Sequence, residues 1–471
     1  MTIESLSGTT FDARPPRARR GQPTGRTYRE PAREIPVYAE TDVLVVGGGP
    51  AGCAAAAAAA RLGAHVTLVE RYGHLGGLAT GGLVIWIDRM TDWEGRQVIT
   101  GFASDLLDRL PKDAFIGPDR EQWGSRDAAV AAYWAERSSA FKGVVTWSPT
   151  VDPEWLKLAS LQAVIDAGVT LMLHTWGAAP IVEDHRLAGV VFESKEGRQA
   201  IRATVVVDTT GDGDLYALAG APFESDVDEA SIHHAMNVAW LWAGVDMERW
   251  LAFKTQEPQA VAVFMDRARE ALGFAEKPHV AWRSDVALFM GPRLSGYSPL
   301  VIEDLTAVEI ESRRRMVEHL EFFRRHAPGF EHAWIMLTAP QMGARHSRRL
   351  AGVAKVVQGE WKQAVVHPDE IGVSPGPSPQ FANVSIPYGS LVPKDLDNLL
   401  TAGRHISCDP QSHTFLREIP QCWMTGQAAG VAAALAAGKG VTPRRVPVAE
   451  IQQELTRQGV FLQQRAPVEA R

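Results

Sequence analysis

A run of glycines near the amino terminus carries the strongest chemical signal in this sequence. Gly47-Gly48-Gly49-Pro50-Ala51-Gly52 has the spacing G-x-G-x-x-G and lies between an apolar run and an alanine-rich run. Gly47 permits a tight turn, Gly49 lets the backbone approach a pyrophosphate, and Gly52 allows a helix to pack closely on a strand. The helix that follows would offer free N–H groups and a partial positive charge to the phosphates. The predicted dinucleotide contacts in this run are Gly47, Gly49, Pro50, Ala51 and Gly52.

A carboxylate follows these glycines at the distance that a dinucleotide site requires. Glu70 ends the next apolar run, eighteen residues after Gly52. Its carboxylate can accept hydrogen bonds from both ribose hydroxyls and disfavours a 2′-phosphate, which argues against NADP. A glycine turn that binds nothing is the alternative, and the combination of strand, helix and acid argues against it. NAD and FAD both stay open, because both cofactors bind through this fingerprint.

The residues after Glu70 carry a resemblance that separates these two cofactors. Arg71-Tyr72-Gly73-His74-Leu75-Gly76-Gly77-Leu78-Ala79-Thr80 leads from the acid into a second glycine pair. This arrangement resembles the glutathione-reductase-type FAD fold, in which the loop wraps the cofactor beside its pyrophosphate and ribityl chain. The resemblance therefore implies FAD. Related reductases can attach flavin covalently to a histidine in this loop, but the offset of His74 from Gly76 differs from that pattern. The implied contacts in this segment are Arg71, Gly76, Gly77, Leu78 and Ala79.

Further segments are similar to one branch of that fold, the bacterial FAD-dependent oxidoreductases akin to fumarate reductase flavoproteins. The matching segments are residues 207–214, 343–349, 398–404, 419–420 and 426–430. Many related flavoproteins have Asp where this chain has Arg404, and the branch usually has Glu where this chain has His346. The resemblance covers about residues 36–440. It implies flavin contacts from Gly211, Asp212, Gly403, Arg404, Gly426, Gln427 and Ala428.

Basic residues beyond the cofactor motifs are the candidates for substrate chemistry. Arg345 and Arg348 could clamp a substrate carboxylate through bidentate hydrogen bonds. Alternatively, one or two arginines of this cluster tie a substrate domain to the FAD domain by ion pairs. His405 and His346 are candidate bases, since an imidazole can move a proton near neutral pH. His413 with Arg417 is a further candidate, and a structural role stays open for each histidine.

The pattern of apolar residues along the chain predicts the elements that position these residues. Short apolar runs predict strands at 42–46 and 66–70, with an alanine-rich helix at 50–62 between them. A helix is expected at 156–165, and strands at 169–173, 188–191, 204–207 and 398–402 are expected to return to the same sheet. Long helices are predicted around 309–323 and from about 420 to 437, the latter ended by Gly438. Tryptophans such as Trp240 and Trp242 would either line a substrate pocket or fill a core.

This order of elements, with the resemblance, predicts an α/β protein. Its expected parts are a Rossmann-like FAD-binding domain of the glutathione-reductase type and an inserted α+β substrate or cap domain. The FAD-binding domain is expected at 36–110, 150–222 and 385–440, and the cap at 111–149 and 223–384. Residues 1–35 are expected to form a disordered or surface arm, and residues 441–471 a C-terminal tail.

Composition narrows the function classes. The 471 residues carry a formal net charge of −7, which gives no positive field for nucleic acid. The three cysteines match neither a zinc site nor a paired redox motif, so we expect no metal and a cytoplasmic, reducing location. No stretch is long and apolar enough for a membrane span. Arg19-Arg20 lacks the apolar segment that an export signal requires.

Three absences simplify the expected chemistry. The sequence has no second nucleotide-binding glycine motif, no C-x₄-C redox pair and no cysteine quartet for an iron–sulfur cluster. The leading expectation is therefore a dehydrogenase or oxidase that moves a hydride from a small organic substrate to flavin N5, with oxygen or an external acceptor taking the electrons. The alternatives are reduction of an activated C=C bond, flavin-dependent hydroxylation, and a non-catalytic FAD-binding partner subunit.

Overall fold

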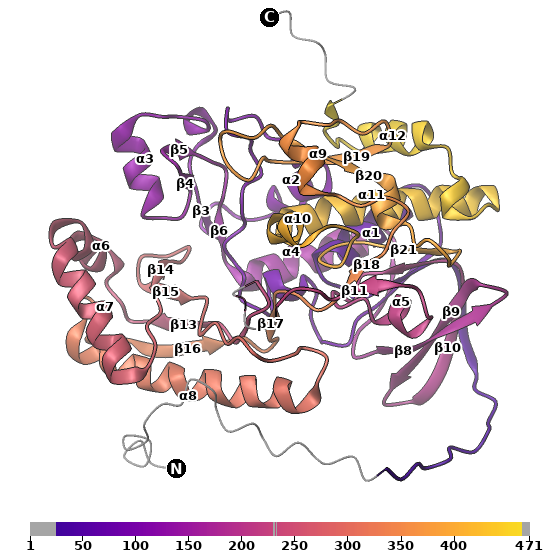
Figure 1. Cartoon of the computed structure of the whole chain (residues 1–471), viewed down its shortest axis with the longest axis horizontal. Coiled ribbons are helices and arrows are strands. Elements are labelled where there is room, and N and C mark those ends of the chain that lie inside the picture. Colours follow the sequence, from indigo (N-terminus) through magenta and orange to yellow (C-terminus); the bar gives the residue numbers. More distant parts are fainter. Residues whose placement is uncertain (1–24, 229–230, 232, 464–471) are drawn as a thin grey trace, which may run out of the picture. The chain divides into compact units, whose positions relative to one another are not determined.

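The computed structural model describes residues 25–228, 231 and 233–463 (Figure 1). The chain divides into two compact units. Of the described residues, the larger unit comprises 32–227 and 346–463, and the smaller unit comprises 25–31, 228, 231 and 233–345. Most of the arm predicted at 1–35 lies outside the described residues. Each unit has its own hydrophobic core.

A seven-stranded sheet forms the centre of the larger unit, with the order β7-β2-β1-β10-β9-β8 and β21 paired to β10. Strands β7, β2, β1, β10 and β21 run parallel, whereas β9 and β8 extend the sheet antiparallel. The strands are β1 (Val37–Val46), β2 (Val66–Val69), β7 (Thr170–Met172), β8 (Trp176–Glu183), β9 (Arg186–Ser194), β10 (Gly197–Asp208) and β21 (Leu399–Thr401). The predicted return of distant strands to one sheet is confirmed.

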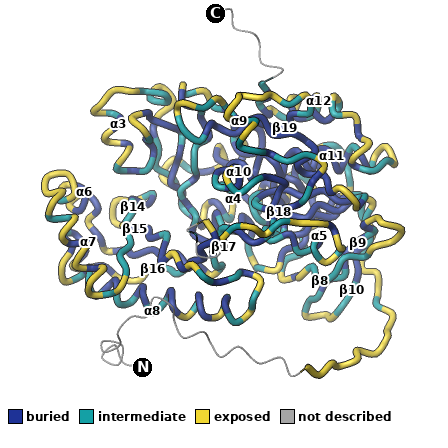
Figure 2. The backbone as a smooth tube through the Cα atoms, in the orientation of Figure 1, coloured by how far each residue is buried: buried dark blue, intermediate teal, exposed yellow. Residues whose placement is uncertain are grey.

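Two small-residue helices pack tightly beside this sheet. Helix α1 (Pro50–Ala60) is almost entirely alanine, and α11 (Ile419–Lys439) lies against it (Figure 1). A Cβ atom at Gly426 would lie 2.2 Å from the carbonyl oxygen of Ala51, and one at Gly430 would lie 2.1 Å from that of Ala55. Only glycine allows this approach, so α11 is buried over most of its length (Figure 2).

The remaining elements of the larger unit are short. The helices are α2 (Phe102–Leu107), α3 (Ala128–Ala135), α4 (Pro153–Asp166), α5 (Asp214–Leu218), α9 (Gln358–Lys362), α10 (Pro410–Leu416) and α12 (Val448–Arg457). The 3₁₀ turns are η2 (Gly77–Ala79), η3 (Arg120–Gln122), η4 (Tyr388–Leu391) and η5 (Pro443–Arg445). The paired strands are β3 (Phe115–Ile116) with β6 (Thr150–Val151), β4 (Ala140–Phe141) with β5 (Val144–Val145), β11 (Phe223–Glu224) with β18 (Arg349–Leu350), and β19 (Glu370–Ser374) with β20 (Val384–Pro387).

The smaller unit is an antiparallel sheet packed on helices around an aromatic core. The sheet has the order β14-β15-β13-β16. Trp240, Trp242, Phe289, Phe323 and Phe330 are all buried in one cluster, so these two tryptophans fill the core. The elements are β12 (Met236–Asn237), β13 (Trp240–Ala243), β14 (His279–Val280), β15 (Val286–Phe289), β16 (Trp334–Thr338), β17 (Gly343–Ala344), α6 (Met247–Gln256), α7 (Pro258–Leu272) and α8 (Ile302–His326).

Several predicted boundaries need correction. Residues 111–149, 223–227 and 346–384, expected in the cap, belong to the larger unit, where short strands pair them with one another or with its other segments. The expected C-terminal tail contains α12, whose Ile451 and Leu455 are fully buried. Helix α11 continues through Gly438 and ends before Gly440, which adopts the left-handed conformation that closes helices. Within the described chain, no helix is long and apolar enough to cross a membrane.

Candidate flavin site

The glycine turn predicted from the sequence connects β1 to α1. Gly47 has φ of 103°, and a Cβ atom there would lie 2.5 Å from the carbonyl oxygen of Thr209. A Cβ atom at Gly52 would lie 1.8 Å from the carbonyl oxygen of Gly47. A Cβ atom at Gly49 would meet no close neighbour, and no side chain caps the first turn of the helix. The turn therefore leaves N–H groups available for a phosphate, as a dinucleotide site requires.

Glu70 lies directly beside this turn, with its carboxylate held by two backbone groups. The Gly48 N–H donates to Oε2 at 2.6 Å, and the Tyr72 N–H donates to Oε1 at 2.8 Å. Burial raises the pKa of Glu70, while these two hydrogen bonds oppose that shift. These hydrogen bonds fix the carboxylate at the end of β2, where it is predicted to meet the ribose hydroxyls.

The second glycine pair meets the first. Gly76 has φ of 92° and Gly77 has φ of 50°, and a Cβ atom at Gly77 would lie 2.8 Å from Cα of Gly49. Leu78 and Ala79 complete the turn η2, of which Ala79 is buried. The guanidinium of Arg71 lies 5.1 Å from the centre of the Tyr72 ring. Residues 71–79 thus lie against the glycine turn at the start of α1.

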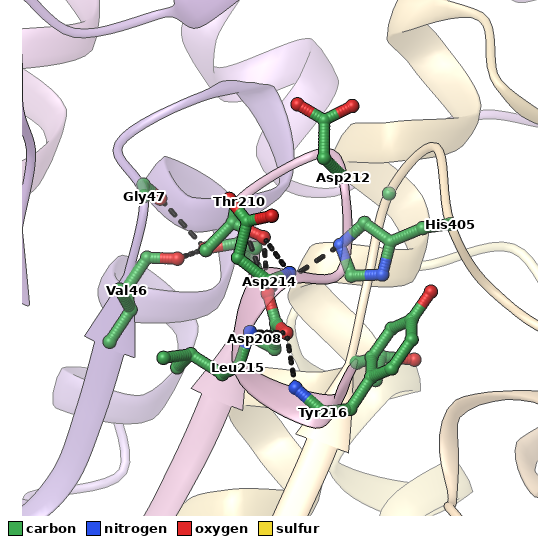
Figure 3. Close-up of polar contacts among 12 residues, drawn as sticks. Val46, Gly47, Asp208, Thr210, Asp212, Asp214, Leu215, Tyr216 and His405 are labelled. Carbon is green, nitrogen blue, oxygen red and sulfur yellow. Dashed lines mark hydrogen bonds and ion pairs between the residues drawn. The ribbon is translucent and has the colours of Figure 1, made fainter. Parts of the chain in front are cut away.

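The loop after β10 is the next part of the candidate site, and hydrogen bonds to Asp208 hold this loop in place (Figure 3). The carboxylate of Asp208 accepts hydrogen bonds from the N–H and hydroxyl groups of Thr210 and from the N–H groups of Leu215 and Tyr216. Asp208 is fully buried, and it therefore closes the loop onto the start of α5. The sequence analysis did not select Asp208, although an acid that ends a buried strand before Thr-Thr-Gly is the signal that could have found it.

Asp212 and Arg404 form an ion pair instead of being free for a ligand. The Arg404 guanidinium donates to Oδ1 of Asp212 at 2.8 Å, and the Ser347 hydroxyl donates to the same oxygen at 2.7 Å. Burial raises the pKa of Asp212, but Arg404 and Ser347 outweigh burial and hold that pKa below its usual value. A Cβ atom at Gly211 would lie 3.0 Å from Arg404, so Gly211 makes room for this pair.

The two predicted substrate arginines fall in different units. Arg348 donates to the Asp212 carbonyl at 2.9 Å and to the Asp214 carboxylate at 3.1 Å. This guanidinium is therefore engaged within the larger unit, and its ion pair with Asp214 does not tie one unit to the other. Arg345 belongs to the smaller unit, where its N–H donates to the Ala235 carbonyl. A carboxylate clamp by these two residues therefore stays a prediction.

The predicted bases are both fully buried. His405 lies beside the Tyr216 ring, and its Nε2 is 3.8 Å from Asp208 (Figure 3). Burial lowers the pKa of His405, and the nearby Asp208 carboxylate opposes that shift. His346 Nε2 is 2.8 Å from the Arg349 guanidinium, which also donates to the Cys408 carbonyl. Both imidazoles therefore face other side chains of the larger unit.

The remaining predicted contacts surround the starts of α1 and α11. Gly403 has φ of 90°, and its N–H donates to the Thr425 hydroxyl. Gly426 packs against α1, Ala428 is fully buried, and Gln427 accepts a hydrogen bond from the Phe102 N–H at 2.9 Å. The structure thus supplies packing reasons for these three residues of α11. Among the described residues, no cluster of three or more His, Cys, Asp or Glu could hold a metal ion.

Two curated proteins are similar to part of this chain. Two curated reductases of Methanopyrus kandleri, digeranylgeranylglycerophospholipid reductases 2 and 1, are each 28% identical to this chain over 176 and 182 residues. Each match covers 36% of this chain, and it spans only 38% and 40% of the relatives' length.

Solved structures are similar at low identity. A geranylgeranyl bacteriochlorophyll reductase-like protein from Thermoplasma acidophilum is 14% identical, with a TM-score of 0.43 over 89% of this chain and 82% of that one. A myxobacterial FAD-dependent halogenase is 13% identical, with a TM-score of 0.44 over 89% of this chain and 79% of that one.

A family model decides the class of this protein. The model described as FAD dependent oxidoreductase matches residues 42–455, which include both glycine pairs, the Asp208 loop and α11. The cofactor is therefore FAD, and the turn at Gly47–Gly52 with Glu70 has the glycine geometry and the carboxylate that fit its ADP half. The chain belongs to the FAD dependent oxidoreductase family.

Proposed function

We propose that this enzyme reduces an activated carbon–carbon double bond in a small organic substrate. Reduced FAD supplies a hydride for such a bond. A proton must then reach the second carbon, and two electrons must come from an external donor for each turnover. The names of the two curated relatives, both reductases, support this direction over the oxidation that the sequence analysis favoured.

The observation that carries the proposal is a group of buried or half-buried basic side chains next to the start of α11. Arg349, Arg404 and Arg417 all act electrostatically on the imidazole of His413. When a hydride adds to a double bond conjugated to a carbonyl, negative charge develops on the carbonyl oxygen. Fixed positive charge in a poorly solvated region stabilises that charge strongly. The basic cluster therefore favours hydride addition to the substrate.

Hydride removal from the substrate would suit this cluster less well. Loss of a hydride from a C–H bond leaves positive charge on carbon unless a base removes a proton first. The predicted bases do not offer this assistance readily, because burial lowers the pKa of His405 and His346 faces the Arg349 guanidinium. The surrounding arginines would oppose such positive charge.

An anaerobic stopped-flow experiment tests the direction of the reaction. The FAD-loaded protein is reduced with dithionite and mixed with α,β-unsaturated acids, ketones and esters, while flavin absorbance is followed. We expect rapid flavin reoxidation by an unsaturated compound and none by its saturated analogue. If oxidised protein is instead bleached by amines or hydroxy acids, and unsaturated compounds do nothing, the oxidation hypothesis replaces this one. Appearance of an oxygen atom from O₂ in the product would establish hydroxylation.

A further inference from the structure

His413 is a buried histidine of the larger unit. It lies on α10 with 1% of its surface exposed. Within the described chain, neither of its ring nitrogens has a hydrogen-bond partner. Buried polar atoms are almost always paired, because an unmade hydrogen bond in the interior costs free energy. Two unpaired nitrogens on one ring therefore indicate a partner outside the chain.

The surroundings of His413 are basic. Its ring meets that of His346 edge to face, with ring centres 4.8 Å apart. Burial lowers the pKa of His413 well below its usual value, and His346, Arg417, Arg349 and Arg404 lower that pKa further. The imidazole is therefore neutral near pH 7, with one N–H donor and one acceptor nitrogen.

Arg417 adds a second donor of the same kind. Its guanidinium is 3.3 Å from the Glu418 carboxylate through one terminal nitrogen. Its Nε is buried and has no hydrogen-bond partner among residues 25–228, 231 and 233–463. Arg349 and Arg404 have carboxylates of their own, at Asp226 and Asp212. The free donor capacity of this cluster thus lies on His413 and on the Nε of Arg417.

The cluster lies next to the proposed flavin-binding segments. Arg404 and Arg417 both act electrostatically on the Cys422 thiol, in the first turn of α11. A Cβ atom at Gly403 would lie 3.7 Å from that sulfur and 3.0 Å from Cβ of Ala51 in α1. The starts of α1 and α11 and the basic cluster are therefore close together in the larger unit.

We propose that His413 and Arg417 form a subsite for a negatively charged oxygen of the substrate. This proposal rests on the proposed function, because it names the part of the substrate that activates the double bond. The oxygen belongs either to a carboxylate or to a carbonyl that takes up enolate charge during hydride addition. The imidazole N–H and the guanidinium Nε–H donate to it, and the surrounding arginines stabilise its charge.

His405 is a poorer partner for such an oxygen, although both of its ring nitrogens also lack hydrogen-bond partners in the described chain. The Asp208 carboxylate lies 3.8 Å from its Nε2, and that charge would repel an anion. We therefore assign the subsite to His413, because arginines surround it whereas a carboxylate lies beside His405.

A binding experiment with the full FAD-loaded chain tests the subsite without requiring turnover. Benzoate and acetate represent carboxylates, 4-nitrophenolate represents an enolate, and benzamide and acetamide are the neutral controls. Binding is followed by the flavin difference spectrum. We expect at least one anion class to bind, and the His413→Phe and Arg417→Met variants to weaken that binding by about tenfold or more with FAD content unchanged.

Matched variants keep this test decisive. His413→Asn keeps one donor and is expected to retain more affinity than His413→Phe. The Asn variant also keeps the test possible if the Phe variant fails to fold. His65→Asn is the control, because that side chain is 92% exposed. If no anion binds, or if the His413 and Arg417 variants that retain FAD bind as wild type does, the subsite is wrong. Anion binding through His413 without any double-bond reduction would contradict the proposed function alone.

Discussion

At the scale of single residues, the site is controlled by how each carboxylate is held. Asp208 accepts four hydrogen bonds and closes its loop, whereas Asp212 is bound to Arg404 and Ser347. Asp214 carries the least satisfied charge. Burial, Asp212 and Asp208 together raise the pKa of Asp214 to about 6, against the influence of Arg348. Neighbouring carboxylates of one loop therefore have different protonation behaviour.

The Glu70→Gln variant is expected to weaken FAD binding. An amide at this position keeps one oxygen but directs an NH₂ group at one of the two backbone N–H groups that now donate to Glu70. The neutral amide is also a weaker acceptor for the ribose hydroxyls than the carboxylate, so FAD affinity should fall by about tenfold or more. Flavin fluorescence titration of the apoprotein measures this, with the exposed Glu196→Gln as control. Unchanged affinity would remove Glu70 from the cofactor site.

The Asp214→Asn variant is expected to change how stability depends on pH. Because the pKa of folded Asp214, about 6, lies above the ordinary 3.8, the carboxyl favours the folded state below about pH 4 and loses that contribution as pH rises through about 6. Relative to wild type, the variant should gain about 1–2 kcal/mol between pH 4 and pH 7, discounted because the side chain is 33% exposed. Urea denaturation at both pH values measures the difference. The exposed Asp395→Asn should show no such trend, and neither should Asp214→Asn if the pKa is ordinary.

At the scale of elements, the contact between α1 and α11 positions the candidate flavin site. Gly426 and Gly430 are spaced by four residues on α11, and both face carbonyl oxygens of α1. The side chains of α1 are also small, and Ala54 through Ala57 are fully buried. Since α1 begins at the glycine turn and α11 begins near Arg417, this contact sets the distance between the ADP end and the basic cluster.

Two glycine substitutions on α11 should have opposite effects. A Cβ atom at Gly430 would lie 2.1 Å from a backbone oxygen of α1, so Gly430→Ala must push the helices apart and destabilise the protein by about 1–3 kcal/mol. Gly438 is helical with no atom within 4 Å of such a Cβ, so Gly438→Ala should stabilise by about 0.5–1 kcal/mol. Thermal melts of both FAD-loaded variants measure the shifts. A Gly430→Ala melting temperature equal to that of wild type would contradict the close contact.

The C-terminal segment is a structural part of the larger unit. The fully buried carboxylate of Glu370 accepts hydrogen bonds from the backbone and the side chain of Gln463. Gln458 bonds to Gln427 of α11 and to the Ala58 carbonyl of α1. Helix α12 and the residues after it therefore tie together the two helices of the flavin site.

At the scale of the whole molecule, the chain keeps its cofactor motifs and its aromatic core in separate units. Every residue predicted to contact FAD lies in the larger unit. The smaller unit instead centres on Trp240, Trp242 and Phe323, with His319 enclosed among them. Burial lowers the pKa of His319 to about 3, so it stays neutral in this core.

A cavity in the smaller unit should affect stability without affecting FAD content. Phe323 is fully buried, and its ring centre lies 5.0 Å from that of Phe264. Phe323→Ala should destabilise that unit by about 3–5 kcal/mol. Tryptophan fluorescence during urea unfolding should show an earlier transition, while the FAD-to-protein ratio in buffer stays at the wild-type value. Loss of FAD in step with the tryptophan transition would show that the two units unfold as one.

The sequence by itself determined the local frame of the site. The glycine turn, Glu70 and the alanine-rich helix follow from spacing, conformational freedom and hydrophobic pattern, which act over a few residues. The same patterns placed the parallel strands and α11, and the resemblance gave FAD. Boundaries of the inserted unit were less accurate, because two-residue strands such as β11 and β18 have too little pattern to predict.

Only the tertiary structure decided which side chains are free for chemistry. Arg404 and Asp212 are 192 residues apart in sequence and yet form an ion pair, and Arg348 reaches back 136 residues to the Asp212 carbonyl. Neighbouring charge distinguishes His405, beside a carboxylate, from His413, among arginines, although both are buried histidines of one short segment. Charge, burial and hydrogen-bond partners are set by long-range contacts, and local sequence spacing does not encode those contacts.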